Sequence, residues 1–371
     1  MGDLSSETIK DYAAEDADVT FQLKQLFSEK MKKGNVKKLF NDIEMPLTKV
    51  LADMEAEGIN LDISSLSKFS EELRLDIAKL HKNIIMEAGI EFNLDSPKQL
   101  GQILFEVLKV TDKPKKTKTG QYSTSEDVLS KLANDHKIIH NILDYRSLKK
   151  LKSTYVDALP ALINPNTKKL HTTYMQTVAA TGRLSSNNPN LQNIPIKTEK
   201  GREIRRTFIP RNKEFVLLAA DYSQIELRII AALSEDENMQ LAFVNKEDIH
   251  TATAAKVFSV KQNDVTREMR GKAKAVNFGI IYGQSAFGLS QNLNISRGEA
   301  KEIIENYFIQ YPKIRTYMDK TIETAKTNGY VETILGRRRY LKDINSSNAI
   351  VRGHAERNAV NAPIQGSAAD I

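Results

Sequence analysis

The chain has 371 residues, of which 40% are hydrophobic and 27% are charged, a composition typical of folded globular proteins. Its 54 lysines and arginines exceed its 47 acidic residues, and the formal charge of +7 permits a polyanionic partner without requiring one. Cysteine is absent, which excludes a disulfide scaffold, cysteine-ligated zinc, iron–sulfur clusters and a thiol nucleophile. No apolar run reaches about 18 residues, so no membrane span is expected.

The first part of the chain is predicted to be mainly helical. An acidic helix over about 1–30 is followed by a basic connector at 31–38. Apolar residues then recur at spacings of three and four until Gly58, which predicts a second helix. A third helix is predicted over about 63–88, and a further helix begins at the start signal Ser96-Pro97.

A lysine-rich loop at 113–121, KPKKTKTGQ, interrupts this helical region. It contains Lys115 and Lys116 and ends in a glycine turn. Two interpretations stay open: a solvated surface loop, or a flexible basic tip that contacts phosphates.

The character of the sequence changes at about residue 171. Residues 171–220 are rich in Thr, Asn, Pro and β-branched residues, and the apolar run FVLLAA at 215–220 predicts a short buried strand. Residues 240–330 are again predicted to be mainly helical, and 333–341 to form a β-ribbon around a glycine. The last segment, from 348, is predicted to be helical up to Pro363.

Asp221 follows the predicted strand directly, where a side chain can be held in a fixed geometry. Phosphoryl transfer needs a hard cation held by oxygen ligands, and one aspartate can be shared by two Mg²⁺ ions about 3.5–4 Å apart. The carbonyl of Tyr222 is a further candidate ligand. The alternative is that Asp221 caps the turn that follows.

Glu226 also allows two interpretations. With Ser223 it forms the pattern S-Q-I-E, which is typical of a helix capping box. Alternatively, its side chain lies beside the sugar of a bound nucleotide.

A second group of residues lies in 267–283, REMRGKAKAVNFGIIYG. On a helix, the four-residue spacing of Arg270, Lys274, Phe278 and Tyr282 places them along one slowly drifting stripe. Cations suit a triphosphate and aromatic rings suit a base that must be stacked. A solvated face with core rings would explain either half alone, but not the ordered combination.

These two segments resemble bacterial family A DNA polymerases. DYSQIELR from Asp221 resembles the first carboxylate motif of that family, and REMRGKAKAVNFGIIYG resembles its nucleotide-binding finger helix. Other segments match in the family's order: YAAEDAD from Tyr12 (the last motif of the proofreading exonuclease), TGRLSS at 181–186, NLQNIP at 190–195, EDIH at 247–250 and RNAVNAPIQGSAADI at 357–371.

The resemblance implies an α+β fold of the right-hand polymerase type, with an antiparallel palm sheet and mostly helical thumb and fingers. The implied domains are the tail of a 3′–5′ exonuclease-like domain at 1–30, a thumb at 31–165, the first part of the palm at 166–237, fingers at 238–345 and an incomplete second part of the palm at 346–371.

The resemblance also implies a role for individual residues, with Asp221, Arg270 and Lys274 as the catalytic set. Lys274 is in addition a candidate proton donor to pyrophosphate. The implied roles are metal ligation by Asp221 and Tyr222; triphosphate binding by Arg270, Lys274 and His250; exclusion of a ribose 2′-hydroxyl by Glu226; contact with the nucleotide or the template base by Phe278, Tyr282 and Gln224; and contact with primer and template by Arg183, Arg357, Asn361, Gln365, Lys115 and Lys116.

The implied function is template-directed addition of dNTP to a primer 3′-hydroxyl in DNA replication and repair, with Mg²⁺ as cofactor. The implied partners are primer–template DNA and dNTP, contacted through duplex shape and phosphates and not through base sequence. The resemblance further implies a monomer of the bacterial cytoplasm, associated with the nucleoid and not with a membrane.

Two departures from the family pattern matter. The family continues beyond the position of Ile371 into a hairpin with a His-Asp-Glu motif, whose aspartate is the second shared metal ligand. We therefore expect this chain alone to polymerise poorly. The earlier carboxylate segments of the exonuclease are also absent, so we expect no exonuclease activity, which needs several carboxylates around its metals.

Two other functions stay open. A single-subunit RNA polymerase shares the metal-binding aspartate and the basic finger helix, but Glu226 and Phe278 favour deoxynucleotides. A DNA-binding module without catalysis is favoured, for this chain alone, by the missing carboxylate motif. The basic turn Arg337-Arg338-Arg339 is either solvated surface or a contact with template phosphates, and the sequence does not separate these.

Overall fold

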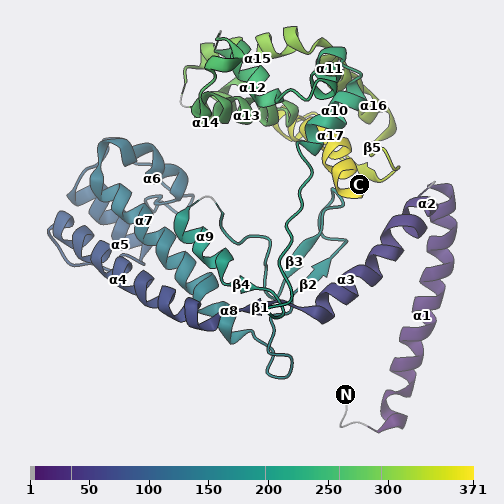
Figure 1. Cartoon of the computed structure of the whole chain (residues 1–371), viewed down its shortest axis with the longest axis horizontal. Coiled ribbons are helices and arrows are strands. Elements are labelled where there is room, and N and C mark those ends of the chain that lie inside the picture. The colour runs from purple at the N-terminus through teal and green to yellow at the C-terminus, as the bar shows by residue number, and fades with distance from the viewer. Residues whose placement is uncertain (1–4, 35, 197, 259, 294) are drawn as a thin grey trace. The chain divides into compact units, whose positions relative to one another are not determined.

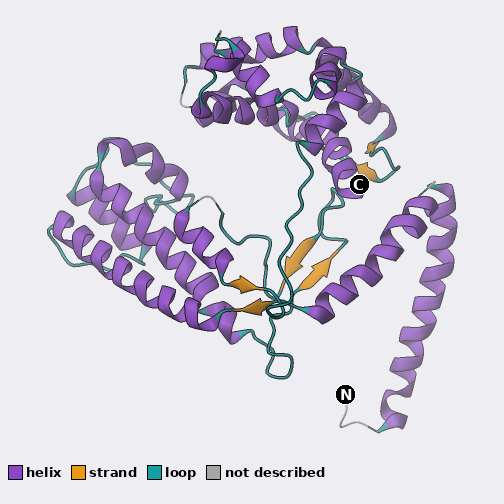
Figure 2. Cartoon of the chain, viewed as in Figure 1, coloured by secondary structure: helices purple, strands orange, loops and turns teal. Residues whose placement is uncertain are grey.

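The structure, a computed structural model, describes residues 5–34, 36–196, 198–258, 260–293 and 295–371. The chain divides into two compact units: unit 1 comprises residues 1–51, 175–185 and 220–371, and unit 2 comprises residues 52–174 and 186–219. Helices dominate (Figure 1), and the strands are few and short (Figure 2). The predicted α+β class is confirmed, whereas the division into exonuclease tail, thumb, palm and fingers stays a prediction.

Unit 2 is built around two helices that lie side by side, α4 (Ile63–Ala88) and α7 (Lys137–Leu151). Asp62 begins α4 by accepting a hydrogen bond from the N–H of Ser65, and Gly89 ends it with a left-handed φ of 70°. The predicted helix over 63–88 is therefore confirmed. The other elements of this unit are β1 (Asn60–Leu61), α5 (Pro97–Gln102), η2 (Ile103–Val107), α6 (Glu126–Leu132), η3 (Ala133–Asp135), η4 (Lys152–Val156), α8 (Ala158–Ala161), α9 (Glu199–Arg206) and β4 (Phe208–Ile209).

Apolar side chains from several faces of α4 and α7 form the two cores of unit 2. One core includes Leu100 and Ile139, and the other includes Leu66 and Tyr155. Strands β1 and β4 pair antiparallel beside the second core, and their residues Leu61 and Phe208 pack into it. This packing fixes the start of α4, which follows β1, and the end of α9, which precedes β4.

Unit 1 contains the C-terminal helices and the N-terminal ones. Its elements are α1 (Ser6–Lys33), α2 (Lys37–Leu39), η1 (Phe40–Glu44), α10 (Ile225–Ser234), α11 (Glu237–Val244), α12 (Ile249–Val257), η5 (Gln262–Asp264), α13 (Arg267–Ile281), α14 (Ala286–Leu293), α15 (Arg297–Gln310), α16 (Pro312–Asn328), β5 (Tyr330–Glu332), β6 (Arg338–Tyr340) and α17 (Ala349–Asp370). Three elements cross between the units: α3 (Met45–Glu57), β2 (Thr173–Met175) and β3 (Ser185–Asn187), of which β2 and β3 pair. No helix in the described ranges is long and apolar enough to span a bilayer.

The core of unit 1 joins α10, α13, α16 and α17. Leu227 and Ile230 from α10 pack with Ile280 from α13, Ile314 from α16 and Ile364 from α17, and all five are buried. Burial of such side chains contributes roughly 1.5–3 kcal/mol each. The start of α10 and the C-terminal end of α13 are thereby held by the same core.

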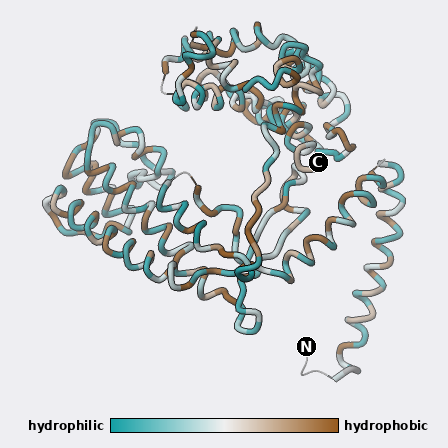
Figure 3. The backbone as a smooth tube through the Cα atoms, viewed as in Figure 1, coloured by the Kyte–Doolittle hydropathy of each residue, from teal (hydrophilic) through white to brown (hydrophobic). Residues whose placement is uncertain are grey.

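The predicted buried strand at 215–220 is wrong. These residues form an extended segment outside any strand, and Val216 and Leu218 are 85% and 89% exposed. The segment is the hydrophobic connection that leads into α10 in Figure 3. A strand needs a neighbouring strand for its main-chain hydrogen bonds, and none of the described strands pairs with 215–220. Asp221 consequently follows an exposed segment and not a core strand.

Three other expectations need correction in their bounds. Helix α1 continues to Lys33, into the predicted connector at 31–38. The predicted ribbon at 333–341 exists, but its first strand, β5, lies before that range at Tyr330–Glu332, and the turn at Gly336 (φ 82°) separates it from β6. Helix α17 does not end at Pro363 but continues to Asp370, with Pro363 buried inside it, because packing of its neighbours in the core outweighs the lost hydrogen bond.

A lysine at Leu218 tests the exposed segment. Because Leu218 is almost fully exposed, Leu218→Lys should change the free energy of unfolding by no more than about 0.5 kcal/mol in urea titrations. The matched change Leu227→Lys, at a fully buried position of α10, should cost several-fold more. Equal losses in the two variants would mean that 215–220 is buried after all.

Candidate functional site

A buried carboxylate at the start of α10 lies at the centre of the candidate site. Gln224 precedes the helix with a left-handed φ of 55°, and no side chain caps the helix. The capping-box interpretation of Ser223 and Glu226 is therefore excluded. Glu226 is 8% exposed, and its carboxylate accepts hydrogen bonds from the guanidinium of Arg183 and the hydroxyl of Tyr282.

Tyr282 connects this carboxylate to α13 and α17. Burial of the phenol, and then the hydrogen bond to Glu226, raise the pKa of Tyr282, so the hydroxyl stays protonated and donates. The Tyr282 carbonyl accepts a hydrogen bond from the Asn361 side chain at 3.5 Å. A β-carbon on the next residue, Gly283 (φ 68°), would lie 2.9 Å from Cγ of Arg357, so only glycine allows this approach.

A buried ion pair holds the loop that bears Arg183. Arg337 donates to Glu44 at 2.5 Å and to Asp370 at 2.6 Å, and the Asp370 side chain is fully buried. A β-carbon on Gly182 (φ 80°) would lie 2.6 Å from Nε of Arg337. Arg337 thus packs against the backbone immediately before Arg183. All three arginines of the basic turn 337–339 are partly buried, and because Arg337 is paired with Glu44 and Asp370, the other two are the remaining candidates for contact with phosphates.

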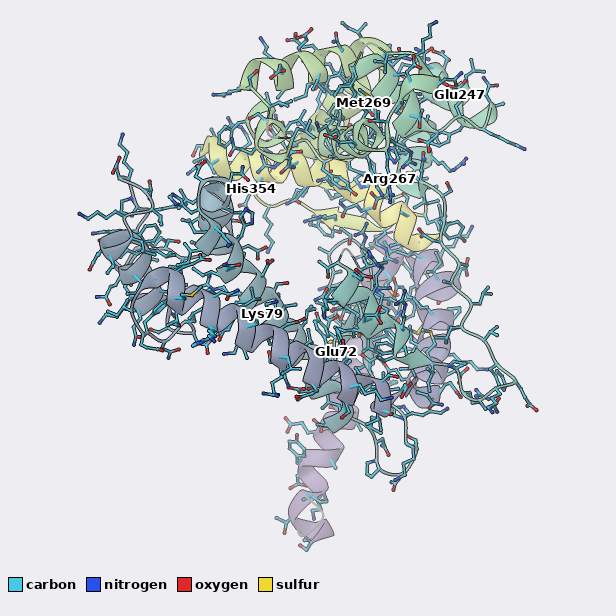
Figure 4. The ribbon with its side chains drawn as sticks, turned by 60° about the vertical axis from the view of Figure 1, so that its left-hand side comes forward. Glu72, Lys79, Glu247, Arg267, Met269 and His354 are labelled. Atoms are coloured by element: carbon cyan, nitrogen blue, oxygen red, sulfur yellow. The ribbon has the colours of Figure 1, made fainter. Side chains whose placement is uncertain are left out.

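Helix α13 presents the predicted stripe on its partly exposed face, and Figure 4 labels Arg267 and Met269 in its first turn. Arg270 donates to Oδ2 of Asp248 through Nε (3.1 Å) and an η nitrogen (2.6 Å). Burial would raise the pKa of Asp248, but the Arg270 hydrogen bond and the Thr251 amide outweigh it and lower that pKa. Lys274 is exposed and has no acidic partner in the described part of the chain.

Three aromatic rings continue the stripe toward Glu226. The Phe278 ring lies between those of His250 and Tyr282, with centroid separations of 5.8 and 6.0 Å. His250 is 2% exposed, and burial lowers its pKa to about 4, so the imidazole is neutral at pH 7. Its Nδ1 lies 2.9 Å from the amide nitrogen of Asn277, a fully buried residue of α13.

Asp221 and Tyr222 lie in the coil before α10, and both are exposed. Asp221 has no hydrogen bond or ion pair within the described ranges, so the alternative that it caps the following turn finds no support. An unpaired carboxylate and a backbone carbonyl are the hard oxygen donors that Mg²⁺ prefers, and Mg²⁺ commonly takes one or two carboxylates together with substrate phosphates. The two residues therefore fit part of such a site, although the described residues contain no cluster of three or more His, Asp or Glu ligands.

Unit 2 carries a separate groove of about 920 Å³ between α6, α7 and residues 189–196 and 198–205, with apolar and cationic side chains in its lining. Lys150 lines it as an exposed cation, and Arg146 and Arg205 line it while donating to the backbone carbonyls of Thr124 and Ile194. Glu126 is the acidic residue in its lining. Such a groove can follow an anionic backbone. Elsewhere in unit 2, the lysine-rich loop is a turn that exposes Lys115 and Lys116.

The structure brings together many of the predicted site residues and leaves others apart. Within unit 1, Glu226 contacts Arg183 and Tyr282 directly. Asn361 and Arg357 pack against the end of α13. Gln365 lies close enough to Tyr282 to lower its pKa slightly, although burial and Glu226 raise that pKa by more. Asp221, Tyr222 and Lys274 make no described contact with this cluster, and Gln224 keeps its buried amide oxygen without a partner.

Sequence reasoning missed several polar residues of the site. Arg146 and Lys150 were detectable, because YRSLKKLK places them one helical turn apart in a basic run. Asp248, Asn277 and Arg337 lie in segments that the sequence did single out, but their contacts could not be predicted, since their partners lie far away in the sequence.

Comparison with known proteins confirms the resemblance found in the sequence. A family model described as DNA polymerase family A matches residues 63–371. DNA polymerase I of Bacillus caldotenax is 51% identical over 350 residues, which are 94% of this chain and 40% of that protein. DNA polymerase I of Borreliella burgdorferi is 49% identical over 373 residues, 100% of this chain and 40% of that protein. The chain thus spans about 40% of the length of these relatives.

A solved structure gives the same relationship in three dimensions. The POL domain of Pol1 from M. smegmatis, in complex with DNA primer-template and dNTP, matches with a TM-score of 0.87 and 43% sequence identity. The match covers 94% of this chain and 61% of that chain.

Removal of the Arg337 guanidinium should destabilise unit 1. Arg337→Met leaves the buried carboxylate of Asp370 without its cation and with only the hydroxyl of Thr333 as a side-chain donor, which we expect to cost about 3–5 kcal/mol of unfolding free energy. The neighbouring change Arg338→Met, which removes a more exposed pair with Glu332, should cost about 1 kcal/mol or less. Urea unfolding of both variants gives the comparison, and similar losses would contradict a special role for Arg337.

The neutral state of His250 predicts a pH dependence of stability. Its folded pKa of about 4 lies below the unfolded value of about 6.5, so the unfolded chain takes up the proton first as the pH falls. Stability is therefore lost between these values, by about 2 kcal/mol at pH 5 for this group. His250→Gln should lose correspondingly less stability between pH 7 and pH 5 than the parent chain. An unchanged pH dependence would show that His250 is not buried in the neutral form.

Proposed function

This chain belongs to DNA polymerase family A, and on that premise we propose that it binds primer–template DNA and a deoxynucleoside triphosphate for template-directed addition of the nucleotide to a primer 3′-hydroxyl. The observation that carries the proposal is the convergence of Arg183, Glu226 and Tyr282 beside the cation-bearing face of α13. Charged and aromatic groups on one rigid element suit a ligand with a triphosphate at one end and a base at the other.

The triphosphate lies along Arg270 and Lys274 in this proposal. Lys274 is free to pair with phosphate oxygens, whereas Arg270 must exchange or share its contact with Asp248. In this proposal Lys274 also donates a proton from its ammonium to the departing pyrophosphate. Phe278 packs against the nucleotide and Tyr282 against the neighbouring template base.

Glu226 gives the sugar specificity. A carboxylate fixed by two hydrogen bonds cannot move aside at low cost, so a 2′-hydroxyl placed against it would meet either a clash or a broken ion pair. The sugar edge of a deoxynucleotide has no such group. This preference argues against the alternative of an RNA polymerase.

Asp221 and the carbonyl of Tyr222 would hold Mg²⁺, with the phosphates of the nucleotide completing its coordination. The ion, when bound, neutralises charge on the phosphate oxygens. The fixed cations of α13 add to this neutralisation and orient the triphosphate for in-line attack. The alternative of a DNA-binding module without catalysis, for this chain alone, is favoured by the lack of a larger acidic cluster in the described residues.

Duplex DNA is held through its phosphates by the groove of unit 2 and by the lysine-rich loop, with Arg357, Asn361 and Gln365 of α17 near the primer end. Binding of a labelled primer–template should therefore fall steeply with salt, by about 10³-fold or more between 50 and 200 mM for six or more phosphate contacts. Lys150→Glu and Lys116→Glu should weaken it. Lys98→Glu, an exposed position in α5 outside the groove, should have a smaller effect. Binding that is independent of salt would contradict the proposal.

Sugar specificity can be measured by binding, without turnover. With primer–template present, the parent chain should bind the templated dNTP more tightly than the matching rNTP, and Glu226→Ala should reduce this preference by about 10-fold or more. Glu226→Gln, which keeps the size of the side chain, should retain most of it. A preference for rNTP in the parent chain would support the RNA polymerase alternative. Primer extension with Mg²⁺ then separates catalysis from binding alone.

A further inference from the structure

A row of buried polar side chains lies on the inner side of α13 and ends at the imidazole of His250. The hydroxyl of Thr253 lies 3.1 Å from the amide oxygen of Asn277, and the amide nitrogen of Asn277 lies 2.9 Å from Nδ1 of His250. The three residues are 3%, 0% and 2% exposed, respectively. Tyr311, whose side chain is 2% exposed, lies close enough to Thr253 for that hydroxyl to affect its pKa. Buried polar side chains are stable only when they are hydrogen-bonded, and a fully hydrogen-bonded network holds its members in one orientation.

The direction of these hydrogen bonds determines where His250 carries its proton. An amide oxygen can only accept and an amide NH₂ can only donate. With its oxygen toward Thr253, Asn277 offers its NH₂ to Nδ1 of His250, which must then be the unprotonated nitrogen. A neutral imidazole with unprotonated Nδ1 carries its hydrogen on Nε2.

The surroundings of His250 agree with a neutral ring that donates through Nε2. Asp248, at the start of α12, favours the protonated ring, whereas Arg270 and Lys274 on α13 disfavour it, and burial disfavours it most. Nε2 has no hydrogen-bonding partner among the described residues, and it is not one of the fully enclosed side-chain atoms without a partner. The ring is also packed against Phe278, which limits its rotation.

We propose that Asn277 is a positioning residue that fixes His250 as the neutral Nε2–H tautomer, so that the ring offers one directed donor to a phosphate oxygen of the bound triphosphate. The phosphate contact rests on the function proposed above, whereas the tautomer rests on the hydrogen bonds alone. The hydrogen bond from Thr253 holds the Asn277 amide in the required orientation. A neutral donor at this place binds a phosphate oxygen without adding a third positive charge next to Arg270 and Lys274, so the two cations are not further repelled before the triphosphate arrives.

The tautomer can be read directly by ¹⁵N NMR of the full chain labelled at histidine. The chain has six histidines, and the His250 signals are identified by their loss in His250→Gln. At pH 7 the account predicts an unprotonated Nδ1 and a protonated Nε2 for His250. A protonated Nδ1, or rapid averaging of the two tautomers, would overturn the proposal.

Substitution of Asn277 tests its role. In Asn277→Asp the carboxylate can only accept, so Nδ1 must carry a proton, and the His250 signals should shift to the imidazolium or to the Nδ1–H tautomer. In Asn277→Leu, which has a similar size and no polar atoms, the two tautomers should average. Asn292→Asp, an exposed position in α14, introduces the same charge and should leave the His250 signals unchanged. Unchanged signals in both Asn277 variants, with folding verified by urea unfolding, would show that Asn277 does not fix the ring.

The phosphate contact is tested by titrating the templated dNTP with Mg²⁺ and primer–template into the labelled chain. The account predicts a shift of the His250 Nε2 signal on binding, and an affinity reduced by about 10-fold in Asn277→Leu with Asn292→Asp unaffected. Binding with an unmoved Nε2 signal would overturn the phosphate contact alone. Absence of dNTP binding by the parent chain would instead overturn the function proposed above and leave the tautomer assignment intact.

Discussion

The contact on which the rest of the site depends is the one between the buried carboxylate of Glu226 and its two donors, Arg183 and Tyr282. A charged carboxylate loses much of its hydration at this depth, so the structure is stable only while both donors stay in place. The requirement ties together three segments that are distant in the sequence: the loop at 175–185, the start of α10 and the end of α13. Any ligand that enters beside Glu226 must respect this geometry or replace its hydrogen bonds.

Two further buried networks keep the surroundings of that contact rigid. Arg337 joins Glu44 to Asp370 and supports the backbone before Arg183, whereas Asn277 joins Thr253 to His250 behind α13. These hydrogen bonds and ion pairs therefore hold in place the residues that surround the exposed face of α13. Lys274 is the exposed cation of this face and has no acidic partner among the described residues.

Local patterns predicted much of the fold. The bounds of α4 followed from Gly89 and the helical spacing before it, because caps and periodicity are properties of neighbouring residues. The apolar run at 215–220 led to the wrong prediction of a buried strand. An apolar sequence indicates only that a segment could be buried, and a buried strand needs a partner strand, which the described residues do not provide. Pro363 gave the opposite error: a proline usually ends a helix, but α17 continues through Pro363 because its neighbours are packed in the core.

The candidate site was predictable where a family motif was present in the sequence and not where a tertiary contact alone defined it. The sequence motifs identified Glu226 and Tyr282 as site residues. Their direct contact could not be predicted, because it depends on how α10 and α13 meet in the core. The roles of Arg337 and Asn277 depend on partners in distant segments, and a single sequence carries no signal of such pairings.

A crystal structure of this chain with a primer–template and a non-hydrolysable dNTP analogue tests the central claim most directly. The account predicts the sugar of the analogue against Glu226, with Arg183 still paired to that carboxylate, and the triphosphate along Arg270 and Lys274. An analogue bound elsewhere on the chain, with the Glu226 cluster and the face of α13 both empty, would contradict it.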